Sequence, residues 1–246
     1  MGITMYFSFK EVLSAGWQIF KKNWKFIIGL GLSTLVLQIV LEIIQQGVRN
    51  RSVALGFILW LAATLISIII TYGWAKVNLN LVRNHHATWS TFRSNPEDWA
   101  RLIQVMLWAL AYSVLYVIIT VLPFAILGGI GLAIDSIILQ KIALGLGSVA
   151  LAGVALYITI RFQFYTLAAV DSRDPSTRAI FKHSVALTHG QFWHLVGWLL
   201  VSALVVLAGA ILIGLGLFVA IPVVTLAQTK IYTILKSKHD SKHETA

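Results

Sequence analysis

The sequence predicts an all-α protein that crosses a membrane six times and has further amphipathic helices at the membrane surface. The first observation is composition: 58% of the 246 residues are apolar and 11% are charged, with a mean hydropathy of +0.83. A soluble domain has about 25% charged residues, so charge is too scarce here for a water-facing surface. The second observation is that several uncharged runs reach the roughly 20 residues that a helix needs to cross a bilayer. Alternating strand patterns are absent from the sequence, and helices satisfy their own backbone groups in lipid.

The N-terminal region, residues 1–25, is predicted to form an amphipathic interfacial helix. Ser8 and Glu11 have the spacing of a capping box, which marks a helix start. Apolar side chains recur at helical spacing, and most of the positions between them are lysines or polar residues; the apolar set is Phe9, Val12, Leu13, Gly16, Trp17, Phe20 and Trp24. A basic amphipathic helix with aromatic side chains on its apolar face is typical of the membrane interface.

Residues 26–235 are predicted to form the membrane domain. The six expected spans are residues 26–44, 53–77, 102–127, 142–164, 192–213 and 215–235. Two uncharged stretches, which begin at residues 102 and 195, would each be about 50 Å long as one helix, whereas the hydrocarbon core is about 30 Å thick. Each stretch must therefore turn back, and we expect the turns at the glycines of these stretches, which are Gly128, Gly129 and Gly131 in the first and Gly214 and Gly216 in the second. Residues 236–246 are predicted to be a polar, disordered cytoplasmic tail.

The distribution of basic residues predicts the orientation. Sixteen Lys and Arg fall on the side of the two termini, and three fall on the other side. Because basic residues accumulate on the cytoplasmic side, we expect a multi-pass protein of the cell membrane with both termini in the cytoplasm. Anionic lipids of that leaflet are the expected partners, since each attracts a nearby basic residue by about 1 kcal/mol. A membrane or cytoplasmic protein is a further candidate partner, and nucleic acid is not expected, because no basic stretch forms a soluble folded module.

A repeat is suggested by two segments that match at a constant offset of 168 residues. Residues 12–29 align with residues 180–197, so that Val12 corresponds to Ile180 and Trp24 to Phe192. A weaker third copy covers residues 95–107. The hypothesis is that the chain contains three units, each with a surface helix followed by a hairpin of two spans.

Polar residues inside the predicted spans are the best functional candidates, because burying them in lipid is costly. Each even-numbered span carries one cation near its cytoplasmic end, and glutamines lie close to two of them; the set is Lys76, Arg161, Lys230, Gln163 and Gln228. One interpretation is that the cations are anchors whose charged ends reach the headgroups. The other is that they converge on a lipid phosphate or another ligand between the spans.

A second candidate site lies at the predicted outer mouth. Gln38 and Glu42 are four residues apart and so share one face of the first span. They could form a polar ligand or ion site. Alternatively, Glu42 simply reaches the headgroups or pairs with Arg49.

Three histidines precede the fifth span. His183, His189 and His194 have spacings of six and five, whereas a spacing of four would place two imidazoles on one helical face. They are interpreted as interface residues, with a ligand or proton role as the less favoured alternative. In the tail, His239 and His243 do have a spacing of four, but no third ligand accompanies them. No metal site, cofactor or catalytic constellation is predicted, and the absence of cysteine excludes disulfides and thiol nucleophiles.

The segment from residue 161 to 195, followed by a glycine-containing double span, resembles a group of prokaryotic multi-pass proteins. The residues that carry the resemblance are Arg161, Val170, Asp171, Ala179, Ser184, Leu187, Gly190 and Pro222. The group includes the membrane domain attached to some glycerophosphodiester phosphodiesterases and stand-alone relatives of unknown function. The catalytic domain of that group is a separate soluble barrel, which no part of this chain resembles. The resemblance therefore implies six spans in a prokaryotic cell membrane and no catalytic residue.

These patterns favour a non-enzymatic integral membrane module that binds or organises lipids or partner proteins. The alternative is a small transporter or lipid-handling protein with a site between the spans. An intramembrane enzyme is the least favoured class, since no nucleophile with a base and no metal set is present in the sequence.

Overall fold

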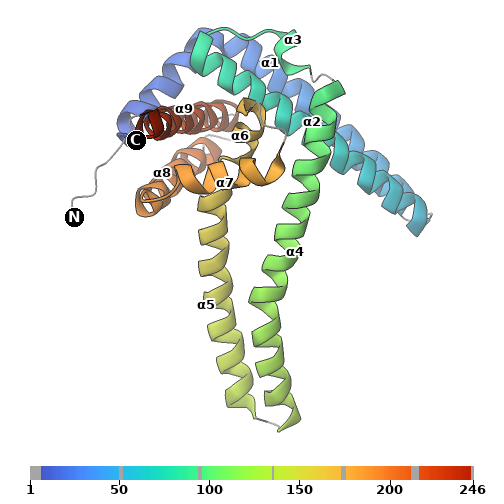
Figure 1. Ribbon diagram of the computed structural model, residues 1–246. Coiled ribbons are helices and arrows are strands. Elements are labelled where there is room, and N and C mark those ends of the chain that lie inside the picture. Colours follow the sequence, from blue (N-terminus) through green and yellow to red (C-terminus); the bar gives the residue numbers. More distant parts are fainter. Residues whose placement is uncertain are drawn as a thin grey trace.

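The fold consists of three long helical hairpins joined by short helices (Figure 1). The computed structural model describes residues 7–49, 52–93, 96–134, 136–172, 176–211 and 216–244, and within these ranges the regular structure is helical, with no strand. The hairpins are formed by α1 (Phe9–Arg49) with α2 (Val53–Asn84), α4 (Pro96–Ala133) with α5 (Ile137–Phe162), and α8 (Phe192–Ile211) with α9 (Leu217–Glu244). The short helices are α3 (Trp89–Phe92), α6 (Tyr165–Asp171) and α7 (Thr177–Leu187).

Six helices of the described ranges are long and apolar enough to cross a membrane. The chain is therefore an all-α, multi-pass membrane protein, as the sequence predicts. The predicted start of the second span agrees with the structure: α2 begins at Val53, where the Ser52 side chain accepts a hydrogen bond from the Leu55 N–H. The third span is predicted from residue 102, and its helix, α4, already begins at Pro96. Proline is favoured in the first turn because its missing N–H has no helical partner there.

The first glycine-rich turn lies later than predicted. α4 continues through Gly128, Gly129 and Gly131 to Ala133, and α5 begins at Ile137. The prediction that the helix breaks at these glycines is wrong, because Gly131 serves close packing instead. A Cβ at Gly131 would lie 3.1 Å from the backbone nitrogen of Gln140 on α5.

The second turn joins α8 to α9 and depends on two glycines that touch. A Cβ at Gly209 would lie 2.9 Å from the carbonyl oxygen of Gly216, and a Cβ at Gly216 would overlap the Gly209 backbone. The predicted turn residue Gly216 is thus at a close approach of backbones, which only glycine permits. The other predicted turn residue, Gly214, lies outside the described residues.

The helix boundaries of the first and third units match at the predicted offset of 168. α1 begins at Phe9 and α7 begins at Thr177, 168 residues later. α1 kinks at Asn23 (φ −121°, ψ 17°), and the corresponding residue, Gln191, separates α7 from α8. The correspondence of both a start and an interruption supports the repeat for these two units.

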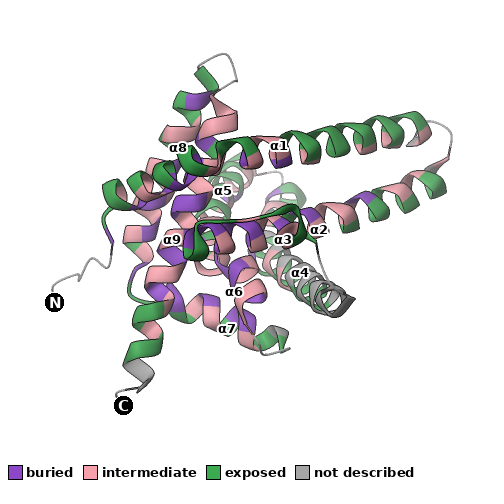
Figure 2. Cartoon of the chain, turned by 90° about the horizontal axis from the view of Figure 1, so that it is seen from above, coloured by how far each residue is buried: buried purple, intermediate pink, exposed green. Residues whose placement is uncertain are grey.

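The core lies where the hairpins meet, in a region that we call the hub: residues 9–30, 72–84, 160–171, 177–188, 195–198 and 220–235. Figure 2 shows buried residues concentrated there, whereas the distal parts of α1 and α2 are largely exposed. The first part of α1 packs along α9, and a Cβ at Gly16 would lie 2.6 Å from the Val223 carbonyl oxygen. Val12, Ile19 and Phe20, which belong to this first part, are buried in the hub.

The contact with α9 gives the N-terminal helix a different environment from the expected one. Part of the apolar face that was expected to rest on lipid is covered by protein, while Trp17 and Trp24 are exposed. The interfacial position of residues 9–25 stays a prediction. α7 is amphipathic: Ile180 and Ser184 are buried and Lys182 is exposed.

The predicted disordered tail is wrong for residues 236–244, because α9 continues without interruption to Glu244. The added turns are held by contacts with other helices. Lys236 forms an ion pair with Asp171 of α6, and the ring of His239 lies 5.6 Å from that of His183 of α7. These partners are distant in sequence, so the local polarity of the tail gave no sign of them.

Candidate functional site

Asp171, the last residue of α6, is at the centre of a charged cluster that joins three helices. Its Oδ1 accepts a hydrogen bond from Arg83 Nη1 at 2.6 Å and its Oδ2 accepts one from Arg83 Nη2 at 2.8 Å. Lys236 Nζ and the Tyr232 hydroxyl also donate to Oδ2, at 2.6 and 3.0 Å. The Asp171 side chain is only 7% exposed. Four donated hydrogen bonds therefore satisfy a buried carboxylate and tie together the ends of α2, α6 and α9.

Local structure explains why these groups meet. Arg83 lies in the last turn of α2, just before His85, which has a left-handed conformation (φ 58°) and ends the helix. Ala168 and Ala169 of α6 are almost fully buried, and their small side chains let α6 pack closely in the hub. Tyr232 and Lys236 are four residues apart on α9 and so share one helical face.

A polar pocket of about 480 Å³ lies beside this cluster, between α2 and α9. Its lining includes Val82 and Arg83 of α2 and Lys230, Thr233, Lys236 and Asp240 of α9. Asp171 neutralises part of the charge of Arg83 and Lys236, and Asp240 is half-exposed and lies 3.7 Å from His239. The Lys230 ammonium forms no hydrogen bond or ion pair with any residue in the described ranges. The pocket thus offers one free cation next to two that are held in place.

The three predicted intramembrane cations contact three different elements. Lys76 Nζ donates to the Arg93 carbonyl at the end of α3 (3.4 Å) and lies 5.5 Å from the centre of the Tyr72 ring. Arg161 instead faces α7, and Lys230 lines the polar pocket, which contains neither Lys76 nor Arg161. Lys76, Arg161 and Lys230 therefore do not converge in this pocket. The cations beside Lys230 are Arg83 and Lys236.

Arg161 and the two predicted glutamines lie in less open surroundings. Arg161 Nη1 donates to Thr188 Oγ1 at 3.4 Å, and its guanidinium stacks over the Tyr157 ring at 5.2 Å. Arg161 Nε and Gln163 Nε2 are buried without a hydrogen-bond partner among the described residues. Gln228 is half-buried on α9, two residues before Lys230, and does not line the polar pocket.

The predicted outer-mouth residues are both exposed on α1. Glu42 accepts a hydrogen bond from Gln46 Nε2 at 3.1 Å, and Gln38 is not part of that bond. A pairing of Glu42 with Arg49 stays a prediction, because the Arg49 side chain is outside the described part of the structure. The geometry therefore gives Gln38 and Glu42 a shared face but no shared interaction.

The histidines have separate environments. His194 Nε2 lies 2.9 Å from the Phe7 carbonyl oxygen, and its ring stacks on Phe9. Burial, together with His239 and Lys236, lowers the pKa of His183 below its ordinary value. Within the described ranges, no group of three or more His, Asp or Glu side chains is arranged to hold a metal ion.

No family model, curated protein or solved structure matches the chain. The function can therefore be inferred only from the geometry of the site.

The sequence interpretation missed all four members of the cluster, Asp171, Arg83, Tyr232 and Lys236, as functional candidates, although Asp171 is among the residues that carry the resemblance to the prokaryotic group. One signal could have singled out Asp171: it is one of only nine acidic residues and directly follows an apolar run. A lone acid in such a position needs a cationic partner if it is buried.

Proposed function

We propose that the protein is a non-enzymatic membrane module that binds anionic lipid in the polar pocket between α2 and α9. The observation that carries the proposal is that Lys230 lies unpaired in a pocket that it shares with Arg83 and Lys236. A lipid phosphate has several acceptor oxygens and a negative charge, so it could accept hydrogen bonds from Lys230 and benefit from the two neighbouring cations.

The distribution of charge supports a cytoplasmic location for this pocket. The pocket lies at the ends of α2 and α9 that are predicted to face the cytoplasm, where the chain places sixteen of its nineteen Lys and Arg residues. Anionic lipids are enriched in the cytoplasmic leaflet. We therefore propose a protein of the cell membrane with both termini in the cytoplasm, and the resemblance to the phosphodiesterase-associated membrane domain stays a hypothesis consistent with this orientation.

The Asp171 cluster has a positioning role in this proposal. Its carboxylate holds Arg83 through two hydrogen bonds and Lys236 through one. Fixed side chains lose less conformational entropy when a ligand binds than free ones do. Arg83 and Lys236 would thus supply a preorganised positive wall, and Lys230 would supply the direct contact.

A transporter or lipid-handling protein is the second candidate, and the sequence linked it to convergence of Lys76, Arg161 and Lys230. The polar pocket contains only the last of the three. The site described here needs no passage between the two sides of the membrane, and so a binding module accounts for it with fewer assumptions.

The proposal is tested by native mass spectrometry of the purified protein from nanodiscs that contain equal amounts of phosphatidylglycerol and phosphatidylcholine. Lys230→Gln should reduce the bound phosphatidylglycerol at least about tenfold, because a hydrogen bond to a charged group contributes about 1.5–3 kcal/mol. The matched control is Lys182→Gln, which removes the same charge from an exposed position on α7, on the same predicted side of the membrane. An equal loss for both variants, or no loss for Lys230→Gln, would contradict a specific site.

A further inference from the structure

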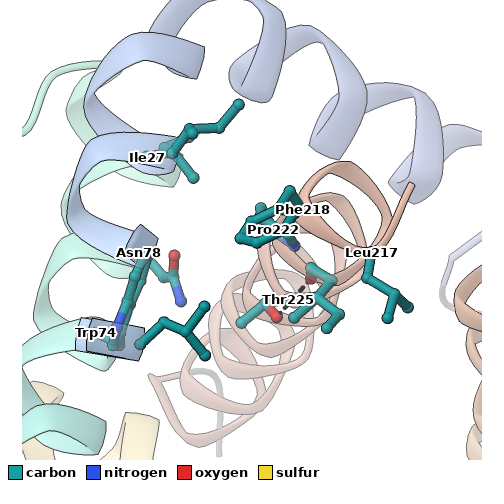
Figure 3. A pocket seen from close by; sticks show the side chains of 11 residues that line it. Ile27, Trp74, Asn78, Leu217, Phe218, Pro222 and Thr225 are labelled. Atoms are coloured by element: carbon teal, nitrogen blue, oxygen red, sulfur yellow. Dashed lines mark hydrogen bonds between the residues drawn. The ribbon is translucent and has the colours of Figure 1, made fainter. Parts of the chain in front are cut away.

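A second cavity lies between α1, α2 and α9 and differs from the polar pocket in character. It has a volume of about 440 Å³, and its lining includes Ile27, Gly31, Trp74, Phe218, Ile221 and Pro222 (Figure 3). None of the described residues that line it is charged. A volume of this size with mainly apolar walls and few polar groups is typical of sites for small apolar ligands.

Asn78 is the exception in these walls. Its side chain lies on α2 and points across the cavity toward α9 (Figure 3). The residue is only 5% exposed, and its amide has no hydrogen-bond partner among the described residues. The amide lines the cavity and its atoms are not fully enclosed by protein, so a ligand in the cavity could accept hydrogen bonds from its N–H groups.

The other polar group in the cavity does not satisfy Asn78. The Thr225 hydroxyl donates to the Ile221 carbonyl oxygen of its own helix at 2.7 Å. Its proton is thus occupied within α9. The Asn78 amide is therefore a polar group of this cavity whose hydrogen bonds a ligand could supply.

We infer that this cavity binds an acyl chain and the adjoining ester of an uncharged glyceride, with the Asn78 amide donating to the ester carbonyl. The apolar walls match a hydrocarbon chain, and the amide matches a neutral acceptor. A charged headgroup would lie unpaired here, because no described residue of the lining carries a charge. A phospholipid contains the same acyl ester as a glyceride. It also carries a charged phosphate, and this charge distinguishes the two kinds of lipid at the cavity.

The inference is independent of the anionic-lipid proposal, since the two sites share no lining residue. Along α2, Asn78 lies one turn before Val82, and along α9, Thr225 precedes Lys230. In the sequence, the buried residues Leu81 and Leu226 lie between the residues of the apolar cavity and those of the polar pocket on α2 and α9. Lys230→Gln should therefore leave the apolar cavity unaffected.

The test uses the full chain in nanodiscs with a monoacylglycerol that carries a photoreactive diazirine in its acyl chain. After illumination, mass spectrometry should locate the label on peptides that contain Trp74 and Phe218. Gly31→Leu fills the cavity, where the nearest atom to an added Cβ is a Trp74 ring carbon at 3.9 Å. This labelling should fall about fivefold or more. Gly29→Leu is the matched control, because it adds the same side chain at a position with no atom within 4 Å and outside the lining.

A second variant separates binding from folding. Asn78→Leu should also reduce labelling about fivefold, the effect of losing about one hydrogen bond, and should not lower the melting temperature, because the amide bonds to no described residue. Labelling that persists in both Gly31→Leu and Asn78→Leu, or that falls equally in Gly29→Leu, would overturn the inference. A lower melting temperature with unchanged labelling would show that Asn78 is structural only. Equal labelling by a phosphatidylglycerol probe with the same chain would overturn the restriction to uncharged lipids.

Discussion

The hub and the α4–α5 hairpin are built on different principles. In the most apolar 18-residue stretch of α9, 44% of the residues are buried inside the protein. In the corresponding 18-residue stretch of residues 137–171, which contain α5, only 6% are buried. The α4–α5 hairpin extends from the hub as two long helices that pack against each other (Figure 1), and it meets the rest of the chain near its base, where Tyr112 contacts Phe162 and Phe181. Hydropathy is thus enough to specify the hairpin, whereas the hub depends on specific pairs.

Because lipid can replace protein around the hairpin but not inside the hub, the same substitution should have unequal effects in the two regions. Leu226 is 0% exposed in the hub and Leu144 is 75% exposed on α5. Leu226→Ala should lower the free energy of unfolding by about 2–5 kcal/mol, from lost burial and the cavity that remains. Leu144→Ala should change it by no more than about 0.5 kcal/mol. Denaturation of both variants in the same detergent measures the difference, and similar losses would contradict the contrast.

The next largest effect should come from the charge at the centre of the hub. Asp171→Asn keeps the shape of the side chain but leaves Arg83 and Lys236 without their anion, which should cost about 3 kcal/mol. This value is at the low end for a buried pair because the Arg83 side chain is 43% exposed. Asp240→Asn is the control, since its side chain is 51% exposed, and should cost about 0.5 kcal/mol or less. Thermal unfolding in detergent measures both effects. Equal melting temperatures of the two variants would contradict the proposed role of Asp171.

A smaller effect is expected at the α1–α9 contact. Gly16→Ala forces a Cβ against the α9 backbone and should cost about 1–3 kcal/mol. Gly153→Ala on α5 adds a methyl group in open space and should stabilise the helix by about 0.5–1 kcal/mol. Opposite signs of the two shifts in melting temperature are the expected result, and a loss at Gly153 would show that the hairpin has packing constraints of its own.

The smallest effect concerns pH. The pKa of His183 is lowered in the folded state, chiefly by burial, with His239 and Lys236 acting in the same direction and Asp240 and Asp171 opposing it. The unfolded chain therefore takes up a proton at higher pH than the folded one does, and stability should fall as the pH drops below about 6.5 toward the lowered folded value. His183→Gln should flatten this part of the stability profile, whereas His189→Gln, at an exposed position, should leave it unchanged.

How far the sequence could predict the structure follows the same contrast. The starts of α2 at Val53 and α4 at Pro96 were predictable, because hydropathy and proline act locally. The buried and exposed faces of α7 were predictable from periodicity alone. The Asp171 cluster was not, since its partners Arg83 and Lys236 are 88 and 65 residues away in sequence. The helical end of α9 was missed for the same reason.

The candidate site was predictable only in part. Lys230 was identified as a candidate, either as a headgroup anchor or as one of three cations that converge with Lys76 and Arg161. The structure places Arg83 and Lys236 beside it instead, and both lie beyond the ends of the predicted spans. A charge at a helix end is ordinary in sequence, and only packing shows which helix ends meet.

Electron spin resonance of spin-labelled lipids around the reconstituted protein would test the central claim most directly. The measured quantity is the preference for immobilised phosphatidylglycerol over phosphatidylcholine in the same bilayer. A headgroup site between α2 and α9 predicts a preference that Lys230→Gln removes and Lys182→Gln retains. A preference that is unchanged by Lys230→Gln, or that both variants reduce alike, would mean that the basic face attracts lipid without this pocket.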